Sequence, residues 1–330
     1  EDLARNSKTG KVTIVAHSMG GLLGKALIKK LEENEDADLI DSFLMVGTPQ
    51  LGTPQGAASL LHGDDEGILN GVIVDASDVR TTAQDMEGAY NLLPSPQYFN
   101  DVTDPVITFA TTSAFTQPWR NQWGDTINSF QEFTEFVTGL GVARPDPAAS
   151  ELQKPEILRA DVYASAANFH DTYDSYVIPS NIRVVQVAGW GVPTVKSITY
   201  RDVHMLGIPP VPMQGYAVVP TIEGDKTVVY PSALSDSPAE SYYFNLKQYR
   251  TDTTRKSGHK DLLSEGPVQN VVLDALEGNP VTLNQFIVST KPNVESVADQ
   301  LLVSTHSPVV LGVHDSNGNF TGIDQSQNTV

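Results

Sequence analysis

The segment Val12–Gly21, which reads VTIVAHSMGG, constrains the fold of this chain more than any other stretch. Its first half is mostly apolar and β-favouring, so Lys11–Ala16 is predicted to form a buried strand. Gly21–Glu32 repeats apolar side chains at helical spacing, and Leu39–Val46 is a second apolar run. A strand, a helix and a strand within about 35 residues make a βαβ unit. We therefore expect a parallel sheet with ligand chemistry at the carboxyl ends of its strands.

The helix predicted at residues 21–32 has one apolar face, which we expect to pack on the sheet. The members of this face are Leu22, Leu23, Ala26, Leu27 and Leu31. The second strand ends in the sequence GTPQLGTPQG at residues 47–56, whose glycines and prolines interrupt regular structure. These residues are expected to form a loop at the carboxyl end of that strand.

Ser18 lies at the junction of the first strand and the helix, with a small residue two positions before it and another two positions after it. Ala16 and Gly20 occupy these positions. A strand that turns sharply into a helix around such a serine is a nucleophile elbow. A serine hydroxyl is a weak nucleophile near neutral pH and needs a base within hydrogen-bond reach. Ser18 is therefore predicted to be a catalytic nucleophile, and the alternative is a tight turn with an incidental serine.

The base and its acid are expected later in the chain, because an elbow of this kind is followed by the acid and then by the histidine. Asp225, in the turn sequence EGDKTVV, is the predicted acid, and Asp202 is the competing carboxylate. His259 lies at the mouth of a loop before a predicted helix and is the predicted base. His17 adjoins Ser18, but neighbouring residues on an elbow point in different directions, which favours a packing role. Solvated or structural roles are expected for His62, His170, His204, His306 and His314.

Residues 81–180 are irregular and rich in Pro, Asn and aromatic residues, and an apolar strand follows at Asn181–Gly189. They are predicted to be an insertion, a cap or lid, between core strands. Within it, apolar residues spaced by three or four predict one helix with an apolar face. This face comprises Trp123, Ile127, Phe130, Phe133, Val137 and Leu140, next to Trp119. The face either packs within its own domain or belongs to a lid that exposes it to lipid.

With its elements in this order, the sequence resembles the α/β-hydrolase lipases, and more narrowly the lecithin:cholesterol acyltransferase-like group. The likeness is carried by AHSMGG around Ser18, MVGTPQLGTP after the second strand, VAGWGVPTVKSITY after the third, EGDKTVVYPSAL at Asp225 and SGHKDLL at His259. It extends from residue 11 to about residue 275, and the segment Gly189–Thr194 is among its most specific parts.

The resemblance implies a fold, a site and a substrate class. The fold is an α/β hydrolase with a mostly parallel sheet, helices on both faces, a cap or lid insertion and a small β-rich C-terminal appendage. The expected segments are a hydrolase core with the elbow at 1–80, the lid at 81–180, a hydrolase core with the acid and the histidine at 181–280, and the β-rich segment at 281–330. By resemblance, the family's catalytic residues fall on Ser18, Asp225 and His259, with the amide of Met19 as an oxyanion donor. The implied substrates are acyl esters of phospholipids or neutral lipids.

The position of Ser18 departs from the family pattern, which has a second oxyanion donor in a loop upstream of the elbow. The strands that would precede Lys11, and this loop, are absent from the 330 residues. The chain is therefore expected to be a hydrolase that lacks its N-terminal strands.

Composition restricts the partners of this chain. With 21 basic and 40 acidic residues, its formal charge of −19 repels a phosphate backbone, so nucleic acid is not an expected partner. No stretch approaches the roughly 18 apolar residues of a membrane-spanning helix, so membrane contact is expected only from the surface, through the lid. Cysteine is absent, which excludes disulfides and thiolate sites and leaves the compartment open, a secreted bacterial protein included.

Neither a cofactor nor a metal is expected. The run HGDDEG at residues 62–67 is interpreted as a solvated acidic loop, with a cation site at Asp64 and Asp65 as the alternative. The predicted function is a serine carboxylic ester hydrolase, a lipase or phospholipase, that acts through an acyl-Ser18 intermediate. An O-acyltransferase differs only in using an alcohol in place of water as acceptor. A non-catalytic lipid-binding protein and an amide hydrolase with the same triad are the remaining alternatives.

Overall fold

The computed structural model describes residues 1–64, 76–203, 212–235, 238–292, 312–314 and 320–322. The chain divides into two units, residues 1–292 and residues 293–330. Within the second unit, β10 (Gly312–His314) pairs antiparallel with β11 (Phe320–Gly322). The predicted β-rich C-terminal segment otherwise lies largely outside the described residues.

The first unit contains a five-stranded sheet with the order β1-β2-β5-β8-β9. Its strands are β1 (Val12–His17), β2 (Ile40–Val46), β5 (Arg183–Trp190), β8 (Glu240–Asn245) and β9 (Ile287–Val288). The pairings from β1 to β8 are parallel and only β9 is antiparallel. The predicted βαβ unit, with a parallel sheet and a third strand after the insertion, is confirmed.

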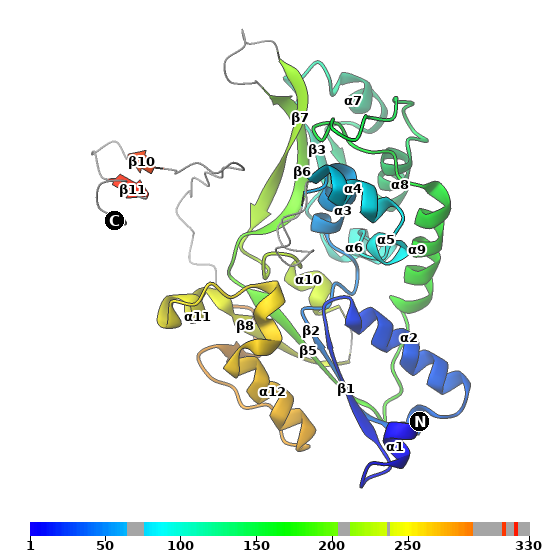
Figure 1. Ribbon diagram of the computed structural model, residues 1–330, viewed down its shortest axis with the longest axis vertical. Helices are drawn as coiled ribbons and strands as arrows, with labels where there is room; N and C mark the ends of the chain where they lie inside the picture. The colour runs from blue at the N-terminus through cyan, green and yellow to red at the C-terminus, as the bar shows by residue number, and fades with distance from the viewer. Residues whose placement is uncertain (65–75, 204–211, 236–237, 293–311, 315–319, 323–330) are drawn as a thin grey trace. The chain divides into compact units, whose positions relative to one another are not determined.

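Helices cover both faces of this sheet (Figure 1). Alternate residues of β2 point to opposite faces, as a period of two requires. Phe43 and Met45 join the buried cluster that contains Ile28 of α2 (Gly20–Glu33). Leu44 and Val46 join the cluster that contains residues of α12 (Gly266–Leu276). β2 is therefore buried from both sides, as expected for a parallel strand with a near-continuous apolar sequence. β1, at the edge of the sheet, is only partly buried, and its Val15 is 38% exposed, so the prediction of a buried strand at residues 11–16 is wrong in this respect.

The orientation of α2 differs from the prediction. Leu22 is buried and Leu31 packs against the core, but Leu23 and Leu27 are 73% and 47% exposed. The face toward the sheet contains Ile28, which is fully buried, and Gly24, where a Cβ would lie 2.5 Å from the ring of Phe43. The helix backbone thus approaches the sheet too closely for a side chain at position 24, and apolar spacing alone selected a face that is partly exposed.

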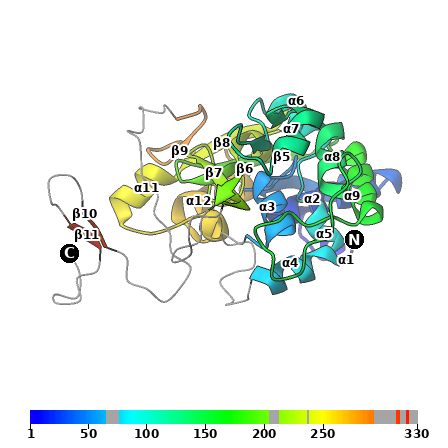
Figure 2. The same cartoon turned by 90° about the horizontal axis from the view of Figure 1, so that it is seen from above.

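A second, four-stranded sheet has the order β4-β3-β6-β7. Its strands are β3 (Ile107–Phe109), β4 (Thr126–Ile127), β6 (Thr194–Val203) and β7 (Met213–Thr221). Two of them come from the predicted insertion and two from the segment after β5. The helices around this sheet are α3 (Pro54–His62), α4 (Ala76–Gln84), α5 (Glu87–Tyr90), α6 (Pro96–Asp101), α7 (Gln117–Trp123), α8 (Phe130–Thr138) and α9 (Ala160–Tyr173). Figures 1 and 2 show α3, α4 and α5 side by side.

The prediction of one helix through Trp123 and Leu140 is wrong. The chain forms α7, the short strand β4 and then α8. Gly124, with φ of 78°, follows the end of α7, and Ser129 begins α8 in a capping box with Glu132. The apolar spacing continued across a break because all three elements pack on the same cluster.

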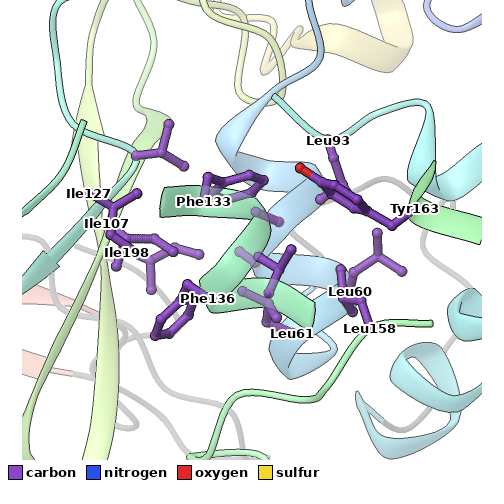
Figure 3. Close-up of a cluster of buried hydrophobic side chains, with 14 of the residues drawn as sticks. Leu60, Leu61, Leu93, Ile107, Ile127, Phe133, Phe136, Leu158, Tyr163 and Ile198 are labelled. Atoms are coloured by element: carbon purple, nitrogen blue, oxygen red, sulfur yellow. The ribbon is translucent and has the colours of Figure 1, made fainter. Parts of the chain in front are cut away.

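That cluster decides between the two alternatives for the apolar face. Phe133 and Phe136 of α8 are fully buried against Ile107, Ile127 and Ile198 (Figure 3). Leu140, beyond the end of α8, is 73% exposed. The aromatic face therefore packs within its own unit in this structure.

The remaining elements complete the first unit. They are α1 (Asp2–Arg5), the 3₁₀ turns η1 (Ala37–Leu39) and η2 (His259–Ser264), α10 (Tyr230–Ala233) and α11 (Leu246–Thr253). The GTPQLGTPQG loop is shorter than predicted, because α3 begins at Pro54, with Thr53 as its cap. Among the described helices, none has the length and the apolar content needed to cross a bilayer.

Candidate active site

Ser18 lies between the last residue of β1 and the first turn of α2, in the strained conformation of an elbow. Its φ is 54°, in the left-handed region that non-glycine residues rarely adopt. Its amide donates to Val46 O at 3.0 Å, and its carbonyl accepts from Gly21 N at 3.0 Å. These bonds connect the serine to the end of β2 and to the helix, so the fold holds the strained backbone in place.

The structure brings together the three side chains that the sequence predicted to form a triad. His259 Nε2 lies 2.8 Å from Ser18 Oγ, and His259 Nδ1 lies 2.9 Å from Asp225 Oδ2. Both distances are those of hydrogen bonds, although 241 residues separate Ser18 from His259. The contacts form one continuous chain from a carboxylate through an imidazole to a hydroxyl.

Asp225 is held in a buried turn between β7 and α10. It is 1% exposed, and its Oδ1 accepts from the amides of Thr227 at 3.0 Å and Val228 at 2.8 Å. Its carbonyl accepts from the amide of His259 at 2.7 Å. Backbone donors therefore fix one carboxylate oxygen and leave the other for the imidazole.

Burial and the acidic partner Asp225 shift the pKa of His259 in opposite directions. Burial by itself lowers the pKa of this imidazole, but the charge of Asp225 and its hydrogen bond outweigh burial and raise the pKa above 6.5. Since Asp225 Oδ2 accepts from Nδ1–H, the neutral ring leaves Nε2 free to accept the proton of Ser18. This is the tautomer that a general base needs.

Gly47, which follows β2, lies directly against the aspartate–histidine pair. Its φ is 61°, and a Cβ there would lie 2.7 Å from Leu262 Cδ1 and 3.1 Å from Asp225 Oδ2. The same Cβ would lie 3.3 Å from His259 Nδ1. Sequence reasoning assigned no role to this residue. The glycine-rich loop after a strand was its only signal.

His17 supports the loop of the base. Its Nε2 lies 2.7 Å from the carbonyl oxygen of His259, and the two rings are 4.9 Å apart. Because a carbonyl only accepts, Nε2 of His17 must carry a proton. Burial, and the positive charge that His259 carries when it is protonated, lower the pKa of His17, which favours the neutral ring. The predicted packing residue is therefore also a hydrogen-bond donor.

Glu265 anchors the segment that leads to His259, and nothing in the sequence pointed to it. This carboxylate is 1% exposed. Its Oε2 accepts from Tyr249 Oη at 2.7 Å and lies 3.1 Å from Arg255 Nε. Its Oε1 accepts from the hydroxyl of Ser257. These contacts tie residues 255–257 to the start of α12.

The competing candidates lie elsewhere. Asp202 is in β6 and accepts from the hydroxyl of Ser113. His62 is buried with Nε2 at 2.9 Å from Tyr200 Oη, and His170 Nδ1 is 2.7 Å from Asp174 Oδ1. His204 and His306 lie outside the described residues, and His314 is described only as part of β10.

The amide of Met19, the predicted oxyanion donor, lies in the turn that leads into α2. It donates to no acceptor in the part of the chain that the structure describes. An uncommitted N–H at the start of a helix is suited to an anionic oxygen.

The alternative cation site at Asp64 and Asp65 is described only in part. Asp65 lies outside the described residues, while Asp64 Oδ2 accepts from Tyr216 Oη at 3.2 Å. No group of three or more potential metal ligands occurs among the residues that were placed.

Comparison with known proteins gives a family match and a structural one. The family model of lecithin:cholesterol acyltransferase matches residues 1–144, so the predicted resemblance is confirmed over that segment. Ser18 and Met19 lie inside it, whereas Asp225 and His259 lie beyond it. No curated protein sequence matches the chain.

Among solved structures, a chain of the crystal structure of the Tle4-Tli4 complex is similar, with a TM-score of 0.51 at 16% identity. The likeness covers 81% of this chain but only 60% of the other chain. At this identity it concerns the fold alone. The fold is an α/β-hydrolase fold, as predicted.

Proposed function

We propose that this protein is a serine carboxylic ester hydrolase of acyl lipids. The observation that carries the proposal is the hydrogen-bonded series Ser18–His259–Asp225 at a nucleophile elbow. A second support is the match of residues 1–144 to a family named for an acyl transfer between lipids. The proposed substrates are acyl esters of phospholipids or neutral lipids.

Acylation would begin when His259 Nε2 accepts the proton of Ser18 Oγ as that oxygen attacks the ester carbonyl carbon. The carbonyl oxygen becomes negative in the tetrahedral intermediate, and the amide of Met19 is placed to donate to it. Asp225 stabilises the imidazolium that has formed. The bond to the leaving alcohol then breaks, His259 returns the proton to that oxygen, and acyl-Ser18 remains.

Deacylation would repeat these steps with water. His259 accepts a proton from water, the hydroxide oxygen attacks the acyl carbon, and the bond to Ser18 Oγ breaks. His259 then protonates Ser18, which releases a carboxylic acid and regenerates the free enzyme. The same imidazole thus serves as base and acid in each half of the reaction.

O-acyl transfer is the second candidate, and the family match specifically favours it. An alcohol hydroxyl would replace water in deacylation, with the same proton transfers and an ester as product. The two activities are separated by adding an alcohol acceptor and measuring the ratio of ester to free acid among the products.

A fluorophosphonate probe and p-nitrophenyl butyrate test the proposal. We expect the protein to be labelled stoichiometrically and to hydrolyse the ester, and Ser18→Ala to do neither. His259→Ala should fold normally and react with the probe at a rate lower by several orders of magnitude. An unlabelled, correctly folded protein would refute the enzyme hypothesis and favour a non-catalytic lipid-binding protein. Faster turnover of an anilide than of esters would indicate an amide hydrolase.

A further inference from the structure

A cavity of about 210 Å³ lies beside the nucleophile elbow. Its walls come from α3, α4 and α5, which contact one another, and from Met19, the residue after Ser18. The cavity is formed entirely by described residues of the first unit. Nothing in the mechanism above uses it.

The walls of the cavity are apolar. No charged side chain lines it, and Leu60 and Val79 are 1% and 4% exposed. Ser59 is one of two hydroxyl residues in the wall, and its Oγ donates to the carbonyl of Asp64 at 2.6 Å, so this hydroxyl is already satisfied. Leu60 also belongs to the buried cluster of Figure 3, so the inner wall is continuous with the core. An ionic or phosphate head group would find no counter-charge in this cavity.

Met19 connects the cavity to the nucleophile. Its backbone continues the elbow from Ser18, while its side chain lines the cavity and is 45% exposed. A Cβ placed on Gly88 of α5 would lie 3.4 Å from Met19 Sδ, so the thioether reaches across to that helix. Met86, also in the wall, is 48% exposed. Two flexible, half-exposed methionines therefore lie in the wall of this apolar cavity.

We propose that this cavity binds the acyl chain of the ester that Ser18 attacks, and that it selects chains of medium length. The inference rests on the proposed function and deepens it. An apolar cavity of about 150 Å³ accommodates benzene, so 210 Å³ corresponds in proportion to about eight carbons. A chain of this length enters past the Met19 side chain when its carbonyl carbon lies at Ser18 Oγ.

Chain length is the first measurement. The substrates of this test are p-nitrophenyl esters from acetate to palmitate, each below its aggregation concentration. Each methylene that enters the cavity should raise kcat/KM about fourfold, because burying a CH₂ contributes about 0.8 kcal/mol. The rise should end near octanoate, where the cavity is full. An ester series with no dependence on chain length, together with measurable acetate turnover, overturns the cavity assignment and leaves the proposed function intact.

Filling the cavity is the second measurement. Ala83 of α4 lines it, so Ala83→Phe should lower kcat/KM for octanoate at least tenfold and leave acetate within twofold. The matched control is Thr81→Phe, since Thr81 is exposed on the same helix and does not line the cavity. It should change neither ester. An unchanged ratio of octanoate to acetate turnover in Ala83→Phe overturns the inference.

Enlarging the cavity is the third measurement, and it remains informative if Ala83→Phe does not fold. Val79→Ala removes two methyl groups from the wall and should move the preferred chain length upward by one or two carbons. A preference that stays at the same chain length contradicts the assignment. If neither acetate nor octanoate is hydrolysed by the unmodified protein and no fluorophosphonate reacts, the proposed function fails and this inference fails with it.

Discussion

The two sheets of residues 1–292 contribute to the molecule in different ways. Turns at the ends of β1 and β2 in the five-stranded sheet supply Ser18 and Gly47, and the turn of Asp225 is hydrogen-bonded to the end of β5 through Gly191 N and Ile222 O at 2.8 Å. The four-stranded sheet supplies none of the triad side chains from its strands. It packs instead on large aromatic residues.

The contacts in the two regions are also of different kinds. Around the triad, the geometry depends on directional hydrogen bonds and on a backbone that a single Cβ would disturb. Around the four-stranded sheet, Phe136 makes tilted or edge contacts with Phe109, Trp119, Trp123 and Tyr200, with centroid distances from 5.2 to 5.8 Å. Substitutions near the triad should therefore affect chemistry first, and those in the aromatic cluster should affect stability first.

The largest effect is expected from Asp225→Asn. Asparagine can still accept the two backbone N–H groups, but its NH₂ would face His259 Nδ1 and favour the tautomer with the proton on Nε2. That tautomer does not accept the proton of Ser18, so kcat/KM for a short ester should fall about 10⁴-fold, with thermal unfolding nearly unchanged. The matched control is Asp202→Asn, which should retain activity. The reverse result would identify Asp202 as the acid.

The same variant predicts a change in pH dependence. Hydrolysis by the unmodified protein should decline as the pH falls through the pKa of His259, which lies above 6.5, because the protonated ring is not a base. Asp225→Asn removes the negative charge that raises the pKa of His259. The acid limb of the residual activity should therefore move to lower pH, and an unmoved limb would contradict this assignment.

Phe136→Ala should show the opposite behaviour. The side chain is fully buried, so its removal leaves a cavity and should lower the free energy of unfolding by about 3–5 kcal/mol. Turnover of a short ester, per folded molecule, should stay within twofold. Urea unfolding measures the first quantity, and Leu140→Ala, at a site 73% exposed, is the control with an expected change below about 0.5 kcal/mol. A large loss of turnover in the folded variant would mean that the two regions are coupled.

Gly47→Ala tests whether the triad depends on backbone proximity. Alanine at φ of 61° is strained by about 1–3 kcal/mol, and its Cβ would press on Leu262 and the Asp225–His259 pair. A displacement of the imidazole should lower kcat/KM roughly 100-fold. Gly124→Ala, also at positive φ but with no atom within 4 Å of the new Cβ, is the control for strain alone. Equal activities of the two variants would remove the role given to Gly47.

The last prediction concerns His62, which lies among the helices beside the four-stranded sheet. Burial lowers its pKa to about 3, whereas an unfolded histidine titrates near 6.5. Because the native pKa is the lower one, the unfolded state binds the proton first, and stability is lost as the pH falls below 6.5. Relative to His62→Gln, the unmodified protein should lose about 1.4 kcal/mol per pH unit between pH 6 and pH 4. Parallel pH profiles of urea unfolding would refute this.

Local sequence patterns were sufficient for the elbow and for the class of fold. The strand before Ser18, the helix after it and the small residues around it are properties of consecutive residues, so periodicity and residue size reveal them. The order of acid and histidine then restricted the candidates to a few, and His259 does lie at Ser18, with Asp225 at His259. Their catalytic roles stay predictions until they are measured.

Sequence patterns gave wrong predictions where the structure depends on which distant residue packs against a given position. Leucine spacing in α2 suggested a face that is partly exposed, because the contact with Phe43 requires Gly24 rather than a large side chain. Spacing across residues 123–140 suggested one helix, because three separate elements share one buried cluster.

The sequence by itself determined that a serine occupies a sharp turn from a strand into a helix, because that geometry is specified by neighbouring residues. Only the tertiary structure decided which carboxylate meets His259, that His17 donates to the loop of the base, and that Gly47 lies against the pair. These contacts join residues far apart in the chain, and a close approach between distant segments depends on how the whole first unit packs.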